Sequence, residues 1–173
     1  MILQEAIDLI RPGIRNTSGT WADIGAGTGM FTLALMEILE EGKIIALDKS
    51  PHALYSILST VSIEFEILEG DFQHPLLLPR LDGIIMANAL HYAQDPIFVL
   101  HNILKSLKKE SPLILIEYDT EMPNQPWVPY PVSFHRFTIL CEHAGLKKPE
   151  LIATHQSIYQ DGNIYSAITH IDF

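Results

Sequence analysis

Short runs of hydrophobic residues alternate along this chain with longer segments in which hydrophobic residues recur at helical spacing. The short runs stop at glycine or polar residues and predict strands near residues 20–25, 43–48, 63–68, 82–87, 112–118, 150–157 and 164–171. The longer segments predict helices near residues 2–11, 28–40, 51–61, 95–108 and 132–144. This alternation is typical of α/β proteins and predicts a single-domain open sheet, mostly parallel, with helices on both faces.

Turn-forming residues support these boundaries. Gly42 is expected to close the helix near 28–40, and Gly145 suits the C-cap of the last helix. Between the last two strands, Gln160-Asp161-Gly162-Asn163 contains Asp-Gly, which is a hairpin signal. We therefore expect the parallel sheet to finish in an antiparallel C-terminal hairpin.

Composition and charge narrow the class of protein. A chain of 173 residues, 47% of them hydrophobic, suffices for one well-buried core, so we expect a single domain over 1–173. The formal net charge of −10, from 11 basic and 21 acidic residues, disfavours a nucleic-acid partner, because such binding relies on clustered Lys and Arg. The basic cluster Lys105, Lys108 and Lys109 is interpreted as a helix C-terminus that complements the helix dipole.

The most informative segment is a glycine-rich turn between the first predicted strand and the second predicted helix. Gly25, Gly27 and Gly29 recur at every second position, so the backbone can turn sharply and a ligand can approach it closely. The amides that open the following helix point toward the same space. A dinucleotide loop of the G-x-G-x-x-G kind would need a small residue at Met30. A tight turn without a ligand is the alternative, but such a turn needs one glycine and not three.

With Asp23 ahead of these glycines, the segment reads Asp-x-Gly-x-Gly-x-Gly and resembles the class I S-adenosylmethionine-dependent methyltransferases. The resemblance implies a Rossmann-like fold that binds S-adenosyl-L-methionine and releases S-adenosyl-L-homocysteine. It implies an N-terminal helix and lead-in over 1–19, a cofactor-binding half over 20–119, and a substrate-side segment over 120–173. It also implies that the turn supplies these cofactor-binding residues: Asp23, Ile24, Gly25, Ala26, Gly27, Thr28 and Gly29.

A second acidic residue, Asp48, ends the second predicted strand. A carboxylate at this position can accept hydrogen bonds from both ribose hydroxyls of a nucleoside, and such charge-assisted bonds are worth about 1.5–3 kcal/mol. The alternative role for Asp48, an N-cap, is better filled by Ser50 ahead of Pro51. Asp48 and the adjacent Lys49 therefore join the expected cofactor site.

A third acidic residue, Asp71, follows the third predicted strand. The family resemblance implies that Asp71 hydrogen-bonds the exocyclic amine of adenine and that Phe72 packs near the ring. A solvated turn aspartate after Gly70 is the alternative. Three acidic residues at three successive strand ends favour the cofactor interpretation, so Gly70, Asp71 and Phe72 are included in the site.

The segment after the fourth predicted strand narrows the chemical class of the methyl acceptor. Asn88-Ala89-Leu90-His91 resembles the branch that methylates small molecules, whereas enzymes acting on base amino groups or glutamine amides usually carry Asn/Asp-Pro-Pro-aromatic there. The resemblance implies that the backbone near Asn88 meets the methionyl amine, with Ala89 and Leu90 beside it. One departure is Leu107-Lys108-Lys109-Glu110-Ser111, where many relatives of this branch have Leu-Lys-Pro-Gly-Gly.

The expected reaction is an in-line displacement, in which positioning the acceptor supplies about 7–11 kcal/mol of the barrier. A general base helps if the acceptor is a hydroxyl or an acidic carbon. Location at the carboxyl ends of strands favours His91, although a structural role is the alternative for each candidate. The candidate catalytic residues are His91, Tyr92, Glu117, Tyr118, Asp119 and His135.

Acceptor recognition is expected from the N-terminal helix and from residues 120–131. Four prolines stiffen this loop, while Trp127 and Tyr130 offer flat apolar faces that can cover a ligand. Anchoring the loop to the core is the alternative role for both aromatics. Only a short segment precedes the first predicted strand, so we expect no cap domain. The acceptor site is then small, open, or completed by a second subunit in a homodimer.

Other chemistry has little support in the sequence. Cys141 is the single cysteine, which excludes an intrachain disulfide and a C-x-x-C pair, and the eight histidines lack metal-ligand spacing, so no metal is expected. No apolar run approaches the ~20 residues that cross a bilayer, and we expect no membrane partner and a cytoplasmic protein. Two other classes stay open: a catalytically silent S-adenosylmethionine-binding partner subunit, and an NAD-dependent oxidoreductase, against which Met30, Asp71 and the hairpin count.

Overall fold

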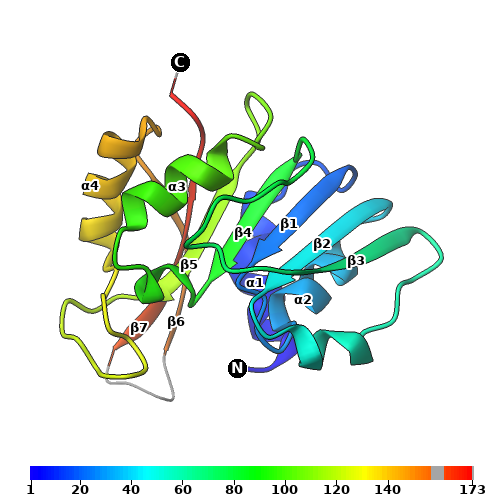
Figure 1. Ribbon diagram of the computed structural model, residues 1–173, viewed down its shortest axis with the longest axis horizontal. Helices are drawn as coiled ribbons and strands as arrows, with labels where there is room; N and C mark the ends of the chain where they lie inside the picture. Colours follow the sequence, from blue (N-terminus) through cyan, green and yellow to red (C-terminus); the bar gives the residue numbers. More distant parts are fainter. Residues whose placement is uncertain (157–161, 173) are drawn as a thin grey trace.

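The computed structural model describes residues 1–156 and 162–172, and its strands form one seven-stranded sheet (Figure 1). The strands are β1 (Thr20–Ile24), β2 (Gly42–Asp48), β3 (Ile63–Glu69), β4 (Gly83–Ala87), β5 (Leu113–Tyr118), β6 (Glu150–Gln156) and β7 (Asn163–Thr169). Their order is β3-β2-β1-β4-β5-β7-β6; β1 to β5 are parallel, and β7 is antiparallel to β5 and β6. The expected mostly parallel sheet with an antiparallel C-terminal pair is confirmed. Residues 160 and 161 of the predicted hairpin turn lie outside the described residues.

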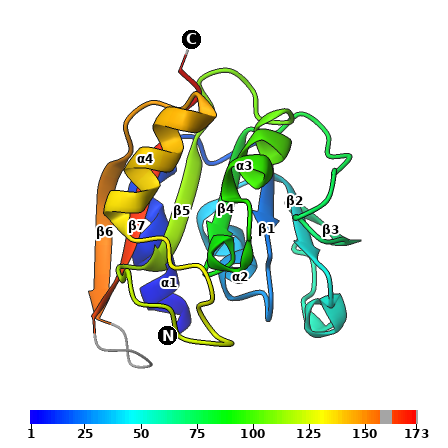
Figure 2. The ribbon, with the colours of Figure 1, turned by 60° about the vertical axis from the view of Figure 1, so that its left-hand side comes forward.

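Helices cover both faces of the sheet. They are α1 (Leu3–Ile10), α2 (Met30–Ile38), α3 (Pro96–Leu104) and α4 (Phe134–Ala144), with short 3-10 helices η1 (Arg11–Gly13), η2 (Pro51–Ser56) and η3 (Leu90–Tyr92). Figures 1 and 2 show α3 and α4 in front of the sheet and α1 and α2 behind it. In β4, Ile84 and Met86 pack into the core beneath α3 and α4, whereas Ile85 packs toward α1 and α2. Because both of its faces are buried, β4 is continuously apolar.

The helix predicted over 51–61 is longer than the helix that forms. Only the 3-10 helix η2 forms there, and the chain is extended from Ile57. Leu54 is buried, but Leu58 and Val61 are exposed, so the second half of the segment has no core to pack against. Helical stability in proteins comes largely from such packing, which explains why the helix stops early.

Two glycines mark boundaries in different ways. Gly42 does not close α2, which ends at Ile38; it begins β2 with φ 129°, and a Cβ there would collide with the backbone of Gly19. Gly145 is the C-cap of α4 with φ 71°, as predicted. Both positions require the left-handed region of φ, which favours glycine.

Lys108 does not belong to a helix terminus, because α3 ends at Leu104. Its Nζ lies 2.8 Å from Oδ1 of Asp82, and Oδ2 of Asp82 accepts a hydrogen bond from the Thr20 amide. Burial alone would raise the pKa of Asp82, but the bonds from Lys108 and Thr20 outweigh it and lower that pKa. In the following turn, Glu110 adopts φ 62° where the resembled branch has glycine.

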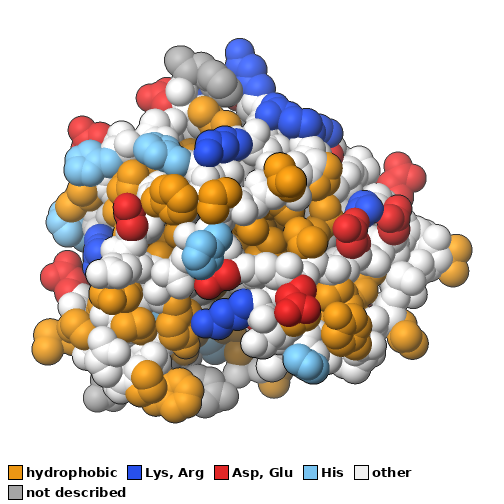
Figure 3. Space-filling view, in the orientation of Figure 1, with side chains coloured by type: hydrophobic (Ala, Val, Ile, Leu, Met, Phe, Trp, Pro, Cys, Tyr) orange, Lys and Arg blue, Asp and Glu red, His pale blue; other side chains and the backbone are white. Residues whose placement is uncertain are grey.

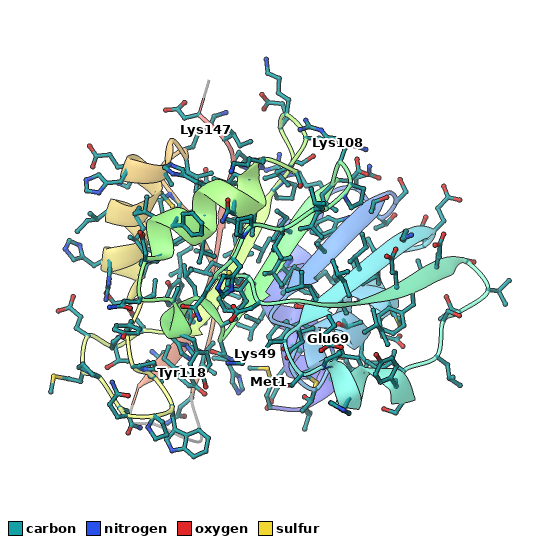
Figure 4. The ribbon with its side chains drawn as sticks, in the orientation of Figure 1. Met1, Lys49, Glu69, Lys108, Tyr118 and Lys147 are labelled. Carbon is teal, nitrogen blue, oxygen red and sulfur yellow. The ribbon has the colours of Figure 1, made fainter. Side chains whose placement is uncertain are left out.

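The carboxyl ends of the five parallel strands meet at the lower edge of the sheet in Figure 1. Asp48 ends β2 and Tyr118 ends β5. Figure 4 places Lys49 and Tyr118 at this edge, and Lys108 and Lys147 at the opposite one. Open α/β sheets bind ligands outside the carboxyl ends of their strands, so this edge is where a site is expected.

Candidate active site

The glycine-rich turn leads from β1 into α2 at this edge. Gly25, Gly27 and Gly29 have φ values of 75°, 55° and 85°. A Cβ at Gly25 would collide with Ala89, and Gly29 is equally crowded by Ile57. A Cβ at Gly27 would meet no atom within 4 Å. Gly27 is therefore the position where the absent side chain keeps room for a ligand, while its neighbours permit close packing.

Asp48 faces this turn from the end of β2. Its Oδ2 accepts a hydrogen bond from the Gly27 amide at 2.8 Å, and its Oδ1 accepts one from the Ser50 amide at 2.8 Å. These bonds fix the carboxylate in the wall of a pocket. Each carboxylate oxygen has a second lone pair, so Asp48 can still accept hydrogen bonds from ligand hydroxyls.

Asp71 lies on the other side of the same pocket. Its Oδ1 accepts a hydrogen bond from the Gln73 amide at 2.9 Å, and the ring of Phe72 lines the pocket beside it. We call this space, which has a volume of about 210 Å³, the glycine-loop pocket. It is lined by Gly25, Gly27, Asp48, Lys49, Asp71, Phe72, Gln73, Asn88, Ala89 and Tyr92.

A neighbouring hollow of about 340 Å³ lies on the α2 side of the turn. It shares Gly25, Gly27 and Asn88 with the glycine-loop pocket and adds Ala26 and Thr28. The predicted cofactor residues that line neither space are Asp23, Ile24, Gly29, Gly70 and Leu90.

Asp23, a predicted cofactor-binding residue, makes its side-chain hydrogen bond within the fold. Only 1% of its surface is exposed, and its Oδ2 accepts a hydrogen bond from the Thr32 hydroxyl at 2.7 Å. Burial raises the pKa of Asp23 to about 6, against the lowering effect of the Thr32 bond. The carboxyl group thus joins β1 to α2 behind the glycine turn and does not face the pocket.

A second pocket, the aromatic pocket, lies beside the first and has a volume of about 430 Å³. Asn88 and Tyr92 line both pockets, so the two spaces meet at these residues. Asn88 has φ 48°, an uncommon conformation for a residue other than glycine. The pocket is lined by Asn88, His91, Tyr92, Tyr118, Asn124, Trp127 and Val128.

The loop between β5 and α4 supplies one wall. Asn124 and Val128 exchange two backbone hydrogen bonds of 3.0 and 2.7 Å, which place Trp127 at the pocket with 68% of its surface exposed. Figure 3 shows hydrophobic side chains gathered over this loop at the lower left. Tyr130 does not line the pocket; its amide donates to the His91 carbonyl at 3.0 Å. Sequence reasoning included Asn124 and Val128 in the expected recognition segment 120–131 but did not single them out, because their pairing leaves no periodic pattern in the sequence.

His91 and Glu117 form a buried pair at the back of the aromatic pocket. Nδ1 of His91 lies 2.6 Å from Oε2 of Glu117, and the His91 amide donates to Oε1 at 3.2 Å. Nε2 of His91 is buried and has no hydrogen-bond partner among residues 1–156 and 162–172. The ring of Tyr92 packs against the imidazole with 4.3 Å between centroids. Burial, and then the nearby Glu117 carboxylate, raise the pKa of Tyr92.

Two other catalytic candidates lie elsewhere. His135 is exposed on α4 and lines neither the glycine-loop pocket nor the aromatic pocket. Asp119 accepts a hydrogen bond from the Phe134 amide at 2.9 Å and so holds the first turn of α4. Of the candidates, the structure therefore brings together His91, Tyr92, Glu117 and Tyr118.

The described part of the chain contains neither a metal-binding group of side chains nor a helix that could cross a membrane. Its His, Cys, Asp and Glu side chains form no group of three or more arranged to hold a metal ion. The helices found within the same ranges are all too short or too polar to cross a bilayer.

Comparisons with known proteins relate this chain to methyltransferases. Residues 22–113 match the protein family described as Methyltransferase domain. The tRNA U34 carboxymethyltransferase of Campylobacter lari is 26% identical over 172 residues, covering 89% of this chain and 58% of that protein. The 2-methyl-6-phytyl-1,4-hydroquinone methyltransferase 1 of Oryza sativa subsp. japonica is 32% identical over 76 residues, covering 43% of this chain and 23% of that protein.

Solved structures agree at the level of the fold. The crystal structure of CalO1, a methyltransferase in calicheamicin biosynthesis in its S-adenosylhomocysteine-bound form, matches with a TM-score of 0.76 at 20% sequence identity. The match covers 98% of this chain and 54% of that one. This chain thus spans only part of the length of these relatives.

Proposed function

The chain belongs to the methyltransferase domain family that its residues 22–113 match, and from that premise we propose that it transfers a methyl group from S-adenosylmethionine to a small-molecule acceptor. The observation that carries the proposal is the junction at Asn88 and Tyr92, where the glycine-loop pocket meets the aromatic pocket. A cofactor in the first and an acceptor in the second would react at this junction. In this division, residues 20–119 hold the cofactor and residues 120–173 help to hold the acceptor.

The residues of the glycine-loop pocket suit the cofactor in their hydrogen bonding and apolar contacts. Gly27 allows close approach of the ligand, and the Asp48 carboxylate can accept from ribose hydroxyls. Asp71 can accept from the adenine amine, while Phe72 offers an apolar face for the ring. When bound, the sulfonium supplies an activated methyl group, so the protein's task is mainly to position the acceptor and exclude water.

His91 is the residue best placed to take a proton from the acceptor. Their 2.6 Å contact needs one proton between Nδ1 of His91 and Oε2 of Glu117, and we assign that proton to Nδ1, so that the Glu117 carboxylate accepts the hydrogen bond. Nε2 then keeps its lone pair at the wall of the aromatic pocket. A hydroxyl acceptor would pass its proton to Nε2, and Glu117 would offset the charge of the resulting imidazolium. Glu117 is thus a positioning residue.

Charge and shape favour a small acceptor over a nucleic acid. The chain carries a net charge of −10, and the residues described as lining the aromatic pocket include no lysine or arginine. Nucleic-acid binding depends on neutralising phosphates with such side chains. The name of one relative points to a tRNA acceptor, so tRNA is the alternative to be tested.

The test begins with cofactor binding. Calorimetric titrations with S-adenosylmethionine, S-adenosylhomocysteine and NAD should show binding of the first two and none of NAD. Methyl-labelled S-adenosylmethionine is then offered with a panel of small hydroxyl and amine compounds and, separately, with total tRNA. Transfer to small molecules supports the proposal, whereas transfer to tRNA alone corrects the acceptor. Cofactor binding without any transfer would support the silent-partner alternative, and binding of NAD alone would overturn the proposal.

A further inference from the structure

Three aromatic side chains from three separate elements form the walls of the aromatic pocket. Tyr92 comes from η3, Tyr118 from the end of β5, and Trp127 from the loop that precedes α4. Aromatic faces bind a planar ring by offset stacking or edge contacts, each worth about 0.5–1.5 kcal/mol beyond area burial. The volume of about 430 Å³ lies in the range of pockets that enclose small ligands. The walls therefore suit a flat, ring-containing acceptor.

The side chains that line the aromatic pocket also limit the charge of the acceptor. Its lining, as far as the structure describes it, contains no Asp, Glu, Lys or Arg. An anionic acceptor would lose hydration there without gaining an ionic partner, which is costly. The Glu117 carboxylate directly behind His91 also repels an anion. A neutral acceptor is therefore favoured over an anionic one.

Two buried polar atoms belong to residues that line this pocket. Nε2 of His91 and Oδ1 of Asn88 have no hydrogen-bond partner within the described ranges, and unpaired buried polar atoms are rare in native proteins. Both atoms accept hydrogen bonds, because Nδ1 of His91 carries that ring's proton toward Glu117. A ligand that donates, such as a hydroxyl, would satisfy one of them, whereas a carboxylate or a carbonyl would satisfy neither.

From these features, and resting on the proposed function, we infer that the acceptor is a neutral, planar phenol that is methylated on its hydroxyl oxygen. Its ring occupies the space between the aromatic walls, and its O–H donates to Nε2 of His91. The proton passes to Nε2 as the O–C bond forms, while the C–S bond breaks and its electron pair stays on sulfur. The products are an aryl methyl ether, S-adenosylhomocysteine and an imidazolium that returns its proton to water.

Tyr92 controls access in this arrangement. Its ring packs on the imidazole, 42% of its surface is exposed, and Nε2 is covered in this structure. We therefore expect the Tyr92 side chain to turn aside when the acceptor ring enters. This residue also lines the glycine-loop pocket, so the movement would occur where the two ligands meet.

The experiment compares four probes by calorimetry, with and without S-adenosylhomocysteine: naphthol, naphthylamine, hydroxynaphthoic acid and cyclohexanol. Naphthol should bind at least about tenfold more tightly than cyclohexanol, which lacks an aromatic face, and than the hydroxynaphthoate anion. With methyl-labelled cofactor, mass spectrometry of the naphthol product should place the label on oxygen. Transfer to naphthylamine should be slower than transfer to naphthol. Proton transfer to His91 makes the phenol oxygen more nucleophilic, whereas the amine nitrogen gains nothing from it.

A matched pair of variants separates the pocket from the rest of the surface. Trp127→Ala should weaken naphthol binding by about tenfold and leave S-adenosylhomocysteine binding unchanged. Phe98→Ala removes another partly exposed aromatic side chain, which lies on α3 and outside both pockets. It should change neither naphthol binding nor S-adenosylhomocysteine binding.

The inference is overturned if the S-adenosylhomocysteine-bound protein binds the four probes equally, prefers the carboxylate, or binds none of them. It is also overturned if the label arrives on nitrogen or carbon. Failure of S-adenosylhomocysteine itself to bind would instead overturn the proposed function, so the two failures can be told apart.

Discussion

Both carboxylate oxygens of Glu117 contact His91: Oε2 lies 2.6 Å from Nδ1 of the ring, and Oε1 lies 3.2 Å from the backbone amide. Neither side chain has more than 2% of its surface exposed. The pair joins the end of β5 to η3 and fixes the orientation of the imidazole relative to the aromatic pocket. A buried carboxylate is costly unless it is well paired, and here each oxygen of Glu117 contacts His91.

We predict that His91→Gln lowers kcat for a phenolic acceptor by about 10²–10⁴-fold, because the general base is lost. S-adenosylhomocysteine binding, measured by calorimetry, should stay unchanged. A nitrophenol has a much more acidic hydroxyl and depends less on a general base, so its rate should fall less. An equal loss for both acceptors would show that His91 is structural. Glu117→Gln should give a smaller loss than His91→Gln in the same assay.

The Asp48 carboxylate provides a second test. Asp48→Asn removes the charge that would accept from ribose hydroxyls, and the Kd for S-adenosylhomocysteine should rise by about 10- to 150-fold, corresponding to about 1.5–3 kcal/mol. Glu69→Gln is the control, because Glu69 pairs in register with Asp48 at the end of β3 but is exposed and lies outside the pocket lining. Similar losses in both variants would indicate a general charge effect instead of a specific contact.

Gly27 and Gly145 allow a matched comparison of two glycines. Both have positive φ, and a Cβ at either would meet no atom within 4 Å. Gly27→Ala and Gly145→Ala should therefore each lower the free energy of unfolding by about 1 kcal/mol, through backbone strain. Only Gly27→Ala should weaken cofactor binding, because its methyl group enters the glycine-loop pocket. Unchanged cofactor affinity in Gly27→Ala would mean that the ligand does not approach this backbone.

The features that sequence reasoning predicted correctly are those set by local backbone requirements. Three alternating glycines permit the positive φ that Gly25, Gly27 and Gly29 adopt, and apolar strands that stop at polar residues place Asp48 at a common edge. The order of elements and the antiparallel ending also follow from local patterns. These signals were sufficient for the fold and for most of the glycine-loop pocket.

What could not be predicted depends on contacts between distant segments. The carboxyl group of Asp23 turns toward Thr32, which is a neighbour only after α2 has packed on β1. His135 resembled His91 as a candidate, but its face of α4 is exposed while Phe137 and Cys141 face the core. The role of each side chain was therefore decided by tertiary packing, which a single sequence does not reveal.

The buried carboxyl of Asp23 should make stability fall as pH rises. Its pKa in the folded protein is about 6, above the ordinary 3.8, so between these values the folded state binds more protons than the unfolded state. The penalty is absent below about pH 4, grows through about pH 6, and reaches on the order of 3 kcal/mol above that. Asp23→Asn keeps an acceptor for the Thr32 hydroxyl and cannot ionise. Urea unfolding should therefore show this variant gaining stability relative to the parent between about pH 4 and about pH 7; parallel pH curves would mean that Asp23 titrates normally in the fold.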